Sequence, residues 1–471
     1  MDANSLGVSS ILSVTLALLA GGVLRSWMLK KFFEVNGDAQ IYGGLAKNLL
    51  LHGRYATSAA NGVLHSTLIR LPGYPLYLAA CFRVFGMENY FAACCVQIVV
   101  DLVACLLVAD FARRMCPAAF GVRAFHCTLW LAALCPFTAI YSAEPLTESL
   151  TIFALALALW AALRFQGRPR WGSALAFTFA VSYAALLRPD GALVGLALAP
   201  AVALRLMLHR GREVRGSGTD SPADSAGAPM RMALVCLLLA LAPFAAWTLR
   251  NWKVFHVIEP LAPRYATDPG EDTFPGWQRW MKTWCLDFVS TYEIYWNVPD
   301  NSLEIDKLPG RAFDSVAQYA ETAKLAADYQ AGGYDLTPEI DARFERLAEE
   351  RIAAKPMRYY AVLPLGRMAD MWLRPRVENL PIDLDWWVYK HHHVETRFSW
   401  AYAALNGLYL LLAITGLLLR PRLWPWMLLY LALRSALLCT IEAPEARYTL
   451  ECFPMLFALG GIALSRALRK A

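Results

Sequence analysis

Charged residues are scarce in this sequence. Asp, Glu, Lys and Arg make up 17% of its 471 residues, whereas a soluble globular protein has about 25%. Hydrophobic residues reach 57%, and the mean hydropathy is +0.37. The shortage of charge argues against a row of soluble domains, although the length alone predicts about three. It favours an all-α polytopic membrane protein whose helices fold as one bundle.

Three other features are missing. The 11 cysteines show no spacing typical of a zinc site or a disulfide framework, and most lie within apolar runs. The segment "MDANSLGVSS" has no basic region, so we expect no cleaved signal peptide. No internal repeat is evident, which argues against an inverted-repeat transporter.

The net charge is +6, but the Arg residues lie beside apolar runs, so we expect membrane lipid and no nucleic acid as a partner.

Apolar runs that can cross a membrane are frequent. A spanning helix needs about 20 mostly apolar residues. Residues 1–250 are predicted to form an N-terminal transmembrane module, 251–398 a mainly helical periplasmic domain, and 399–471 C-terminal transmembrane helices. Residues 211–230, rich in Gly, Ser, Ala and Pro, are predicted to be a disordered loop. The ten predicted spans are 8–28, 90–111, 124–141, 147–164, 171–187, 191–209, 232–250, 399–419, 424–440 and 449–466.

Arg residues mark one side of this bundle. Alternate connections such as "ARRMCPAAFGVR" and "RFQGRPR" are rich in Arg, whereas the short loops between them carry at most one. Basic loops face the cytoplasm in most membrane proteins. We therefore predict a multi-pass membrane protein with both termini in the cytoplasm. Only Lys30 and Lys31, after the first span, oppose this orientation.

The first outer loop, residues 30–89, contains an unexpected acid. In "GDAQIYGGLAKNLLLHGRY" Asp38 can be the N-cap of a helix that ends at Gly53, or a general base at the water–lipid boundary. The following stretch, "PGYPLYLAACFRVFG", is too short to cross, so we expect it to lie along the membrane surface. Arg70 and Tyr74, which border and begin this stretch, are predicted to bind substrate.

Two more acids lie on the same outer side, in "YSAEPLTESL". Pro145 is expected at the first position of a helix, which would make Glu144 its cap and put Glu148 one turn further on the same face. The alternative is a pair of carboxylates that positions an acceptor or a cation. Glu144 is a poor capping residue, so both interpretations stay open.

Arg residues recur at the outer membrane boundary. They include Arg70, Arg188 in "LLRPDG", Arg250 in "WTLRNW" and Arg447 in "EARYTL". Interfacial Arg can reach toward water while its stem stays in lipid. However, Arg is uncommon in short outer loops and binds phosphate in a bidentate manner. For Arg250 and Arg447 we favour phosphate binding.

Two features have no assigned role. Asp101 lies mid-span beside Gln97, where a charge is costly and needs a partner. It can form an interhelical pair or line a functional cavity. The run His391–His393 in "HHHVETRF" offers metal ligands, but adjacent residues do not share a helix face. A requirement for a divalent metal stays open.

Taken in order along the chain, these stretches resemble a family. "GDAQIYGGLAKNLLLHGRY", "RLPGYPLYLAACFRVFG", "SAEPLTESL", "LLRPDG" and "EARYTLECFPMLFALGG" resemble the GT-C glycosyltransferases, and most of all their family 39-like bacterial members. That group includes the aminoarabinose lipid A transferases and relatives of the protein mannosyltransferases. The resemblance implies a location in the bacterial inner membrane and transfer of a sugar from a polyprenyl-phosphate donor to a lipid, glycan or protein acceptor on the periplasmic face.

The resemblance also implies roles for single residues. Asp38 matches the acid thought to act as base, and Glu144 matches a second acidic position. Arg447 and Tyr448 match a late "RY" motif near the donor phosphate. The protein mannosyltransferases have Asp-Glu in the first loop, whereas Asp38 is followed by Ala39, so the sequence departs from their pattern at this position.

Simple chemistry fits this set of residues. A phosphate ester leaves without a general acid, Arg stabilises the charge that grows on the phosphate, and one carboxylate removes the acceptor's proton. A single displacement of this kind inverts the anomeric centre. The rival functions are a flippase or transporter of lipid-linked sugar, a lipid-linked polysaccharide ligase and a non-catalytic membrane scaffold.

Overall fold

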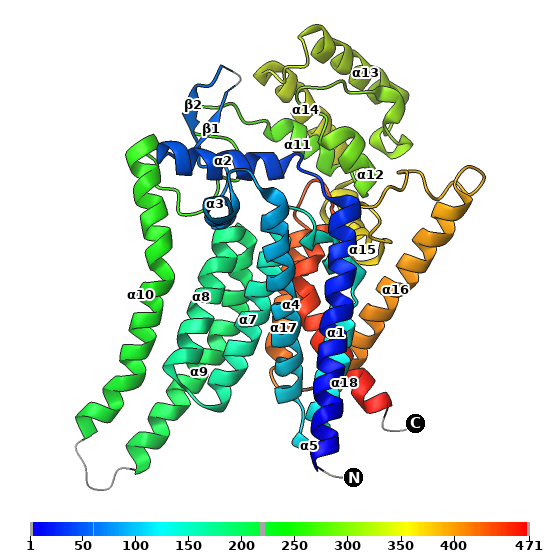
Figure 1. Ribbon diagram of the computed structural model, residues 1–471. Helices are drawn as coiled ribbons and strands as arrows, with labels where there is room; N and C mark the ends of the chain where they lie inside the picture. Colours follow the sequence, from blue (N-terminus) through cyan, green and yellow to red (C-terminus); the bar gives the residue numbers. More distant parts are fainter. Residues whose placement is uncertain (1–2, 60, 217–221, 469–471) are drawn as a thin grey trace. The chain divides into compact units, whose positions relative to one another are not determined.

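The computed structural model describes residues 3–59, 61–216 and 222–468 (Figure 1). The chain forms two compact units. The first comprises Met1–Pro269, Leu408–Leu431 and Leu450–Ala471, and the second comprises Gly270–Gly407 and Ala432–Thr449. The domain boundaries predicted at residues 250 and 398 fall inside helices α10 and α16.

The described part of the first unit is almost entirely helical. Its elements are α1 (Ala3–Phe32), α2 (Asp38–His52), β1 (Ala56–Ser58), β2 (Leu64–Ser66), α3 (Gly73–Phe85), α4 (Tyr90–Met115), α5 (Ala118–Ala133), α6 (Pro136–Ala139), η1 (Ile140–Ser142), α7 (Glu148–Gly167), α8 (Trp171–Leu187), η2 (Pro189–Ala192), α9 (Leu193–Gly216), α10 (Pro222–Phe255) and α18 (Phe453–Ala467). The antiparallel hairpin β1–β2, which pairs Thr57 with His65, was not predicted.

The second unit is built from shorter helices. They are α11 (Pro275–Lys282), α12 (Phe288–Ser290), η3 (Thr291–Tyr295), η4 (Ile305–Lys307), η5 (Gly310–Ala312), α13 (Val316–Ala331), α14 (Pro338–Ala354), η6 (Arg358–Val362) and α15 (Leu363–Leu373). Three elements contribute to both units: α16 (His393–Leu418), α17 (Trp424–Leu438) and η7 (Ala446–Cys452).

All ten predicted spans coincide with apolar helices, so the predicted class of helical polytopic membrane protein is confirmed. Seven described helices are long and apolar enough to cross a membrane, and α5 with α6–η1 forms an eighth candidate, bent by 52°. Helices α8 and α17 are apolar but shorter, with 17 and 15 residues. The seven are Ser10–Phe32, Tyr90–Met115, Glu148–Gly167, Pro189–Met207, Met230–Phe255, His393–Leu418 and Ala446–Ala467.

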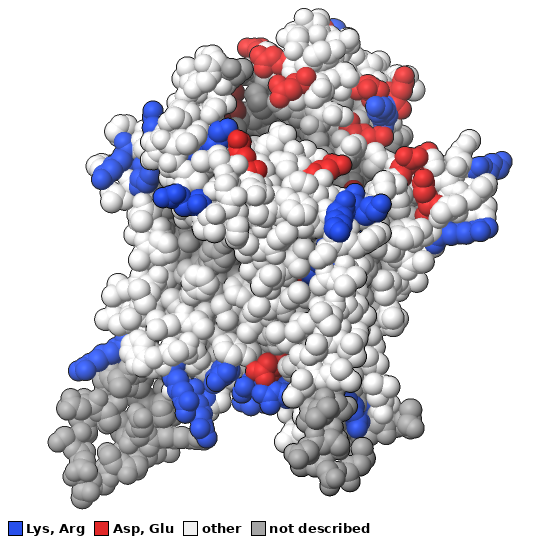
Figure 2. Space-filling view, viewed as in Figure 1, with Lys and Arg blue, Asp and Glu red and all other residues white. Residues whose placement is uncertain are grey.

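The ends of the first unit differ from its middle. Figure 1 shows α2 running across the ends of the spans, while the start of α1 and the end of α18 lie at the opposite end. Charged side chains gather at these two ends, and the band between them is largely uncharged on the face shown in Figure 2. Helix α3 begins directly against α8, since a Cβ at Gly73 would lie 2.6 Å from the carbonyl oxygen of Leu186. Glycine therefore lets the first outer loop rest on the bundle.

The disorder predicted for residues 211–230 is wrong for the part that the structure describes. Helix α9 continues to Gly216, and α10 begins at Pro222. Pro suits the first position of a helix, and Ala, Arg and Glu in these segments are good helix formers. Residues 217–221 lie outside the described residues.

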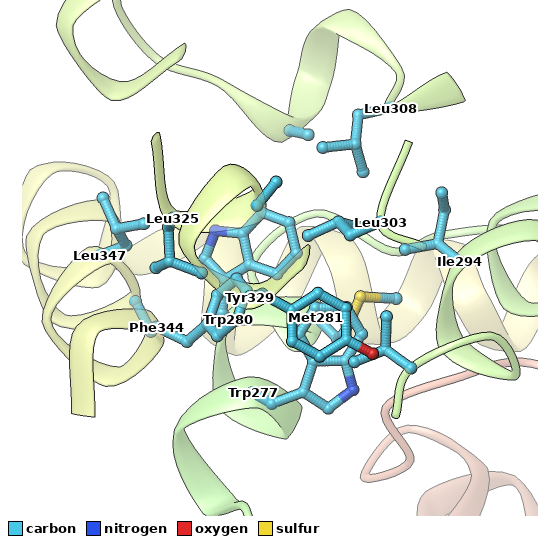
Figure 3. Packing of buried hydrophobic residues seen from close by; sticks show 14 of the residues in the cluster. Trp277, Trp280, Met281, Ile294, Leu303, Leu308, Leu325, Tyr329, Phe344 and Leu347 are labelled. Carbon is cyan, nitrogen blue, oxygen red and sulfur yellow. The ribbon is translucent and has the colours of Figure 1, made fainter. Parts of the chain in front are cut away.

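An aromatic cluster holds the second unit together. Trp277 and Trp280 of α11 pack against Phe344 of α14, with ring centroids 4.9 and 5.0 Å apart (Figure 3). Helix α14 begins after Thr337, whose side chain accepts a hydrogen bond from the Ile340 amide at the N-cap. Large rings of this kind bury much apolar area at low entropic cost.

The mid-span acid Asp101 forms an interhelical ion pair. Arg25 of α1 donates from Nε to Asp101 Oδ2 of α4 at 2.6 Å, and the two side chains are 0% and 2% exposed. Arg25 Nη1 also donates to the Ala133 carbonyl at the end of α5, at 2.7 Å. Of the two interpretations left open by the sequence, the structure supports the interhelical pair.

Loss of this pair should destabilise the bundle. Asp101→Asn leaves a buried guanidinium without its anion, which costs about 3–5 kcal/mol. Lys47→Met, which breaks the exposed Lys47–Glu88 pair, is the matched control and should cost at most about 1 kcal/mol. Thermal unfolding in detergent measures both. If Asp101→Asn melts like the parent, the ion pair does not support the bundle.

Candidate functional site

Asp38 does not cap its helix. It is the first residue of α2, and Gly37 occupies the N-cap position with φ 49°, a conformation that favours glycine. The Gly37 carbonyl accepts from the amides of Gln40 and Ile41. The predicted capping role of Asp38 is therefore wrong, although Gly53 ends the helix in the left-handed conformation as predicted.

The Asp38 carboxylate forms a salt bridge with Arg70. Arg70 Nη2 lies 2.7 Å from Asp38 Oδ1, and the two side chains are 25% and 30% exposed. The Tyr55 hydroxyl donates to the carbonyls of Arg70 and Leu71, at 3.0 and 3.2 Å, which holds the Arg70 backbone in place. The structure thus brings together two predicted site residues that are 32 positions apart in the chain.

Tyr42 links this pair to a second charged group. It follows Asp38 by one helical turn and is 9% exposed. Burial raises the pKa of Tyr42 to about 12, and the negative charge of Asp38 acts in the same direction. The hydroxyl therefore stays protonated at neutral pH. Glu148 and Arg188 also influence its ionisation, so Tyr42 lies within electrostatic range of both groups.

The second group contains three carboxylates around one guanidinium. Arg188 Nη1 lies 3.5 Å from Glu148 Oε1, and Arg188 Nε lies 3.2 Å from Glu451 Oε1 and 3.3 Å from Asp190 Oδ1. The side chains of Glu148 and Glu451 are each only 4% exposed. We call these four residues the Arg188 cluster. It joins the start of α7, the end of α8 and the segment before α18.

The sequence reasoning missed two members of this cluster. Asp190 follows Arg188 in "LLRPDG", and Glu451 lies in "TLECFPMLF", where an acid inside an apolar stretch was the available signal. Glu148 was predicted one turn into a helix capped by Glu144. The helix instead begins at Glu148, with Thr147 at the N-cap position, so that prediction is wrong.

Glu144 lies in the bend between η1 and α7 and is partly buried. Its backbone carbonyl accepts a hydrogen bond from Gln97 Nε2 of α4 at 2.8 Å. Gln97 Oε1 in turn accepts from the Tyr74 hydroxyl of α3 at 2.5 Å. Tyr74 was predicted to bind substrate, but it is fully buried, so in this structure it supports the loop from within.

Arg250 contacts the first outer loop through its guanidinium. Its guanidinium donates to the carbonyls of Thr67 and Tyr55, at 2.8 and 2.7 Å. It also lies against the rings of Tyr55 and Trp247, with its central carbon 5.4 and 5.1 Å from their centroids. These contacts connect the end of α10 to the β hairpin. The predicted phosphate role of Arg250 stays untested.

The late "RY" motif lies in the second unit. Arg447 Nε pairs with Glu445 Oε2 at 2.5 Å, and the Tyr448 hydroxyl donates to Glu445 Oε1. Arg434 donates to the Tyr448 carbonyl at 2.7 and 2.9 Å. Arg376 does the same for the Ala446 carbonyl at 3.0 Å. Two other arginines thus hold the backbone on which Arg447 stands.

One group of described residues could hold a metal. Asp383, Asp385 and His392 in the second unit place their ligand atoms within 4.8 Å of one another. Carboxylate oxygen and imidazole nitrogen suit divalent cations such as zinc or manganese. His392 is the only member of the predicted His391–His393 run in this group, as expected for adjacent residues that face different directions.

Comparisons with known proteins give few relatives. No family model matches the chain, and no curated protein matches it. Among solved structures, the chain is similar to ArnT from Cupriavidus metallidurans bound to undecaprenyl phosphate, at 16% identity over 99% of this chain and 79% of that chain, with a TM-score of 0.38. The apo state of the same protein aligns at 15% identity over 99% and 78%, with a TM-score of 0.37.

The Arg188 cluster should depend on its charge balance. Arg188→Met leaves the buried Glu148 and Glu451 without a shared cation, which should destabilise the protein by about 3 kcal/mol. Adding Glu451→Gln should restore part of that loss, because one of the unbalanced charges is removed. Arg83→Met, at an exposed position of α3, is the control. A double variant less stable than Arg188→Met alone would contradict this account of the cluster.

Proposed function

We propose that this protein is a membrane glycosyltransferase of the GT-C type, which moves a sugar from a polyprenyl-phosphate donor to an acceptor on the periplasmic face. The observation that carries the proposal is the Asp38–Arg70 salt bridge on the first outer loop. Helix α2 crosses the ends of the spans, where a lipid-anchored donor and a water-borne acceptor can meet (Figure 1). We also propose cytoplasmic termini, so that this loop faces the periplasm.

In this mechanism Asp38 is the general base. The acceptor oxygen or nitrogen forms a bond to the anomeric carbon of the sugar while the bond from that carbon to the phosphate oxygen breaks. The proton of the acceptor passes to Asp38, and polyprenyl phosphate leaves as a monoester. Arg70 orients the carboxylate through its salt bridge, and such charge-assisted hydrogen bonds are strong and directional. Attack from the face opposite the phosphate inverts the anomeric centre.

The leaving phosphate needs a cation rather than an acid. Departure turns a phosphodiester into a monoester, so negative charge grows on its oxygens. A guanidinium binds that growing charge more strongly than the ground state and lowers the barrier. We assign this role to Arg447, with Tyr448 beside it. Glu445 orients Arg447 through the contact between Oε2 and Nε.

Glu144 and Glu148 differ in what they can do. The Glu148 carboxylate lies within the Arg188 cluster, so we assign it to the electrostatic support of the site. Glu144 is partly buried and stands on an irregular segment, where a side chain can meet a substrate. We propose that Glu144 positions the acceptor. The acceptor is a lipid, a glycan or a protein.

Asp38→Asn tests the base. Asn keeps the size of Asp but accepts no proton at neutral pH, so the transfer rate should fall by about 10²- to 10⁴-fold. The salt bridge is partly exposed and contributes at most about 1 kcal/mol, so the variant should still fold. The assay is sugar transfer from a defined polyprenyl-phosphate donor in detergent, with thermal stability followed alongside.

The matched control is Glu34→Gln, an exposed acid just before α2, which should transfer like the parent. If Asp38→Asn keeps more than about a tenth of the parental rate, Asp38 is not the base. Glu144 would then be the next candidate.

Arg447→Ala tests the phosphate contact. Removing a donor that acts in the transition state should raise the barrier by about 2–4 kcal/mol. Arg447→Lys should recover only part of the rate, because a point charge cannot bind two oxygens in a fork. Arg397→Ala, an exposed arginine of the same unit, is the control. Parental activity of Arg447→Ala would remove this residue from the mechanism.

A further inference from the structure

We propose that Gln97 is a positioning residue for Glu144, and that Tyr74 in turn orients Gln97. This inference rests on the proposed function, because it assumes that Glu144 acts in sugar transfer. Both groups, a polar amide on α4 and a phenol on α3, are fully buried.

The amide of Gln97 is 0% exposed, and all of its groups are engaged. Nε2 donates to the carbonyls of Glu144 and Ser142, at 2.8 and 3.4 Å. Oε1 accepts from the Tyr74 hydroxyl at 2.5 Å. Turning the amide over would set its oxygen against two carbonyl oxygens, so the partners allow only this orientation.

The segment that carries Glu144 has little regular structure of its own. It lies between η1, which ends at Ser142, and α7, which begins at Glu148. Within it, the Leu146 amide donates to the Glu144 carbonyl at 2.8 Å. The Gln97 amide adds a bond from a neighbouring span, and that bond ties the segment to α4. Because the bond is made to the main chain at Glu144 itself, its loss would let this residue move.

The same contacts reach the element that carries the proposed base. The rings of Tyr74 and Tyr42 lie edge to face with centroids 5.1 Å apart. Tyr42 stands one turn after Asp38 on α2. A continuous set of packed and hydrogen-bonded groups therefore runs from α2 through α3 and α4 to Glu144. This set can hold the base and the acceptor-positioning acid in register.

Two substitutions remove these hydrogen bonds with little change in the size of the side chain. Gln97→Met keeps the length of the side chain and removes its hydrogen bonds, and Tyr74→Phe removes only the hydroxyl. Both should lower kcat by about 10- to 100-fold with KM little changed, since a misplacement of about 1 Å can cost that much. Tyr77→Phe is the matched control, because its hydroxyl also bonds α3 to α4, at the Ala93 carbonyl, but does not touch Gln97. It should transfer like the parent.

A double-mutant cycle separates positioning from general structural support. If Gln97 acts through Glu144, the effect of Gln97→Met on kcat should largely disappear in a Glu144→Gln background. An effect of full size in that background would overturn the proposal, and so would parental kcat in Gln97→Met. Parental kcat in Glu144→Gln would also overturn it.

A second measurement does not need activity. Hydrogen exchange at the backbone amides of residues 143, 144 and 146–148 should be faster in Gln97→Met and Tyr74→Phe than in the parent and in Tyr77→Phe. Unchanged exchange would overturn the positioning role even if the protein transfers sugar. Faster exchange together with a parent that transfers no sugar would instead refute the proposed function and leave the structural part of the inference standing.

Discussion

A charged side chain in or beside the hydrocarbon core must find its partner within the protein, because lipid supplies none. The first unit of this protein meets that constraint at two depths. Arg25 and Asp101 join α1 to α4 within the spans. Arg188 lies between Glu148 and Glu451 and so joins α7, α8 and the segment before α18. In this molecule the packing of the helices and the pairing of buried charges therefore depend on each other.

The first outer loop is likewise held in place by contacts within the protein. Arg250 anchors the loop by donating to its carbonyl groups, and glycine at position 73 lets α3 rest directly on α8. The loop can then present Asp38 and Arg70 as a partly exposed pair. Charged groups held by buried contacts of neighbouring elements keep their geometry without support from the solvent.

Local patterns were enough to predict several elements. Thr337 followed by Pro338 predicts the start of α14, and Gly53 predicts the end of α2, because caps depend on neighbouring residues. The same reasoning failed at Asp38, because Gly37 occupies the N-cap position and the Asp38 carboxylate forms a salt bridge with Arg70. It failed again at Glu144, because the helix there begins later than Pro145 suggests. In both cases a contact or a chain path set by distant residues outweighed the local preference.

The sequence by itself determined the class of the protein, the positions of its spans and the loops that carry acids and arginines at the boundary. Apolar length and charge spacing encode those features, and they can be read along the chain. Only the tertiary structure decided which charged side chains form salt bridges with one another. The pairing of Asp38 with Arg70, and of Glu148 and Glu451 with Arg188, depends on distances between segments far apart in the chain. Such distances arise from helix packing, which no local pattern specifies.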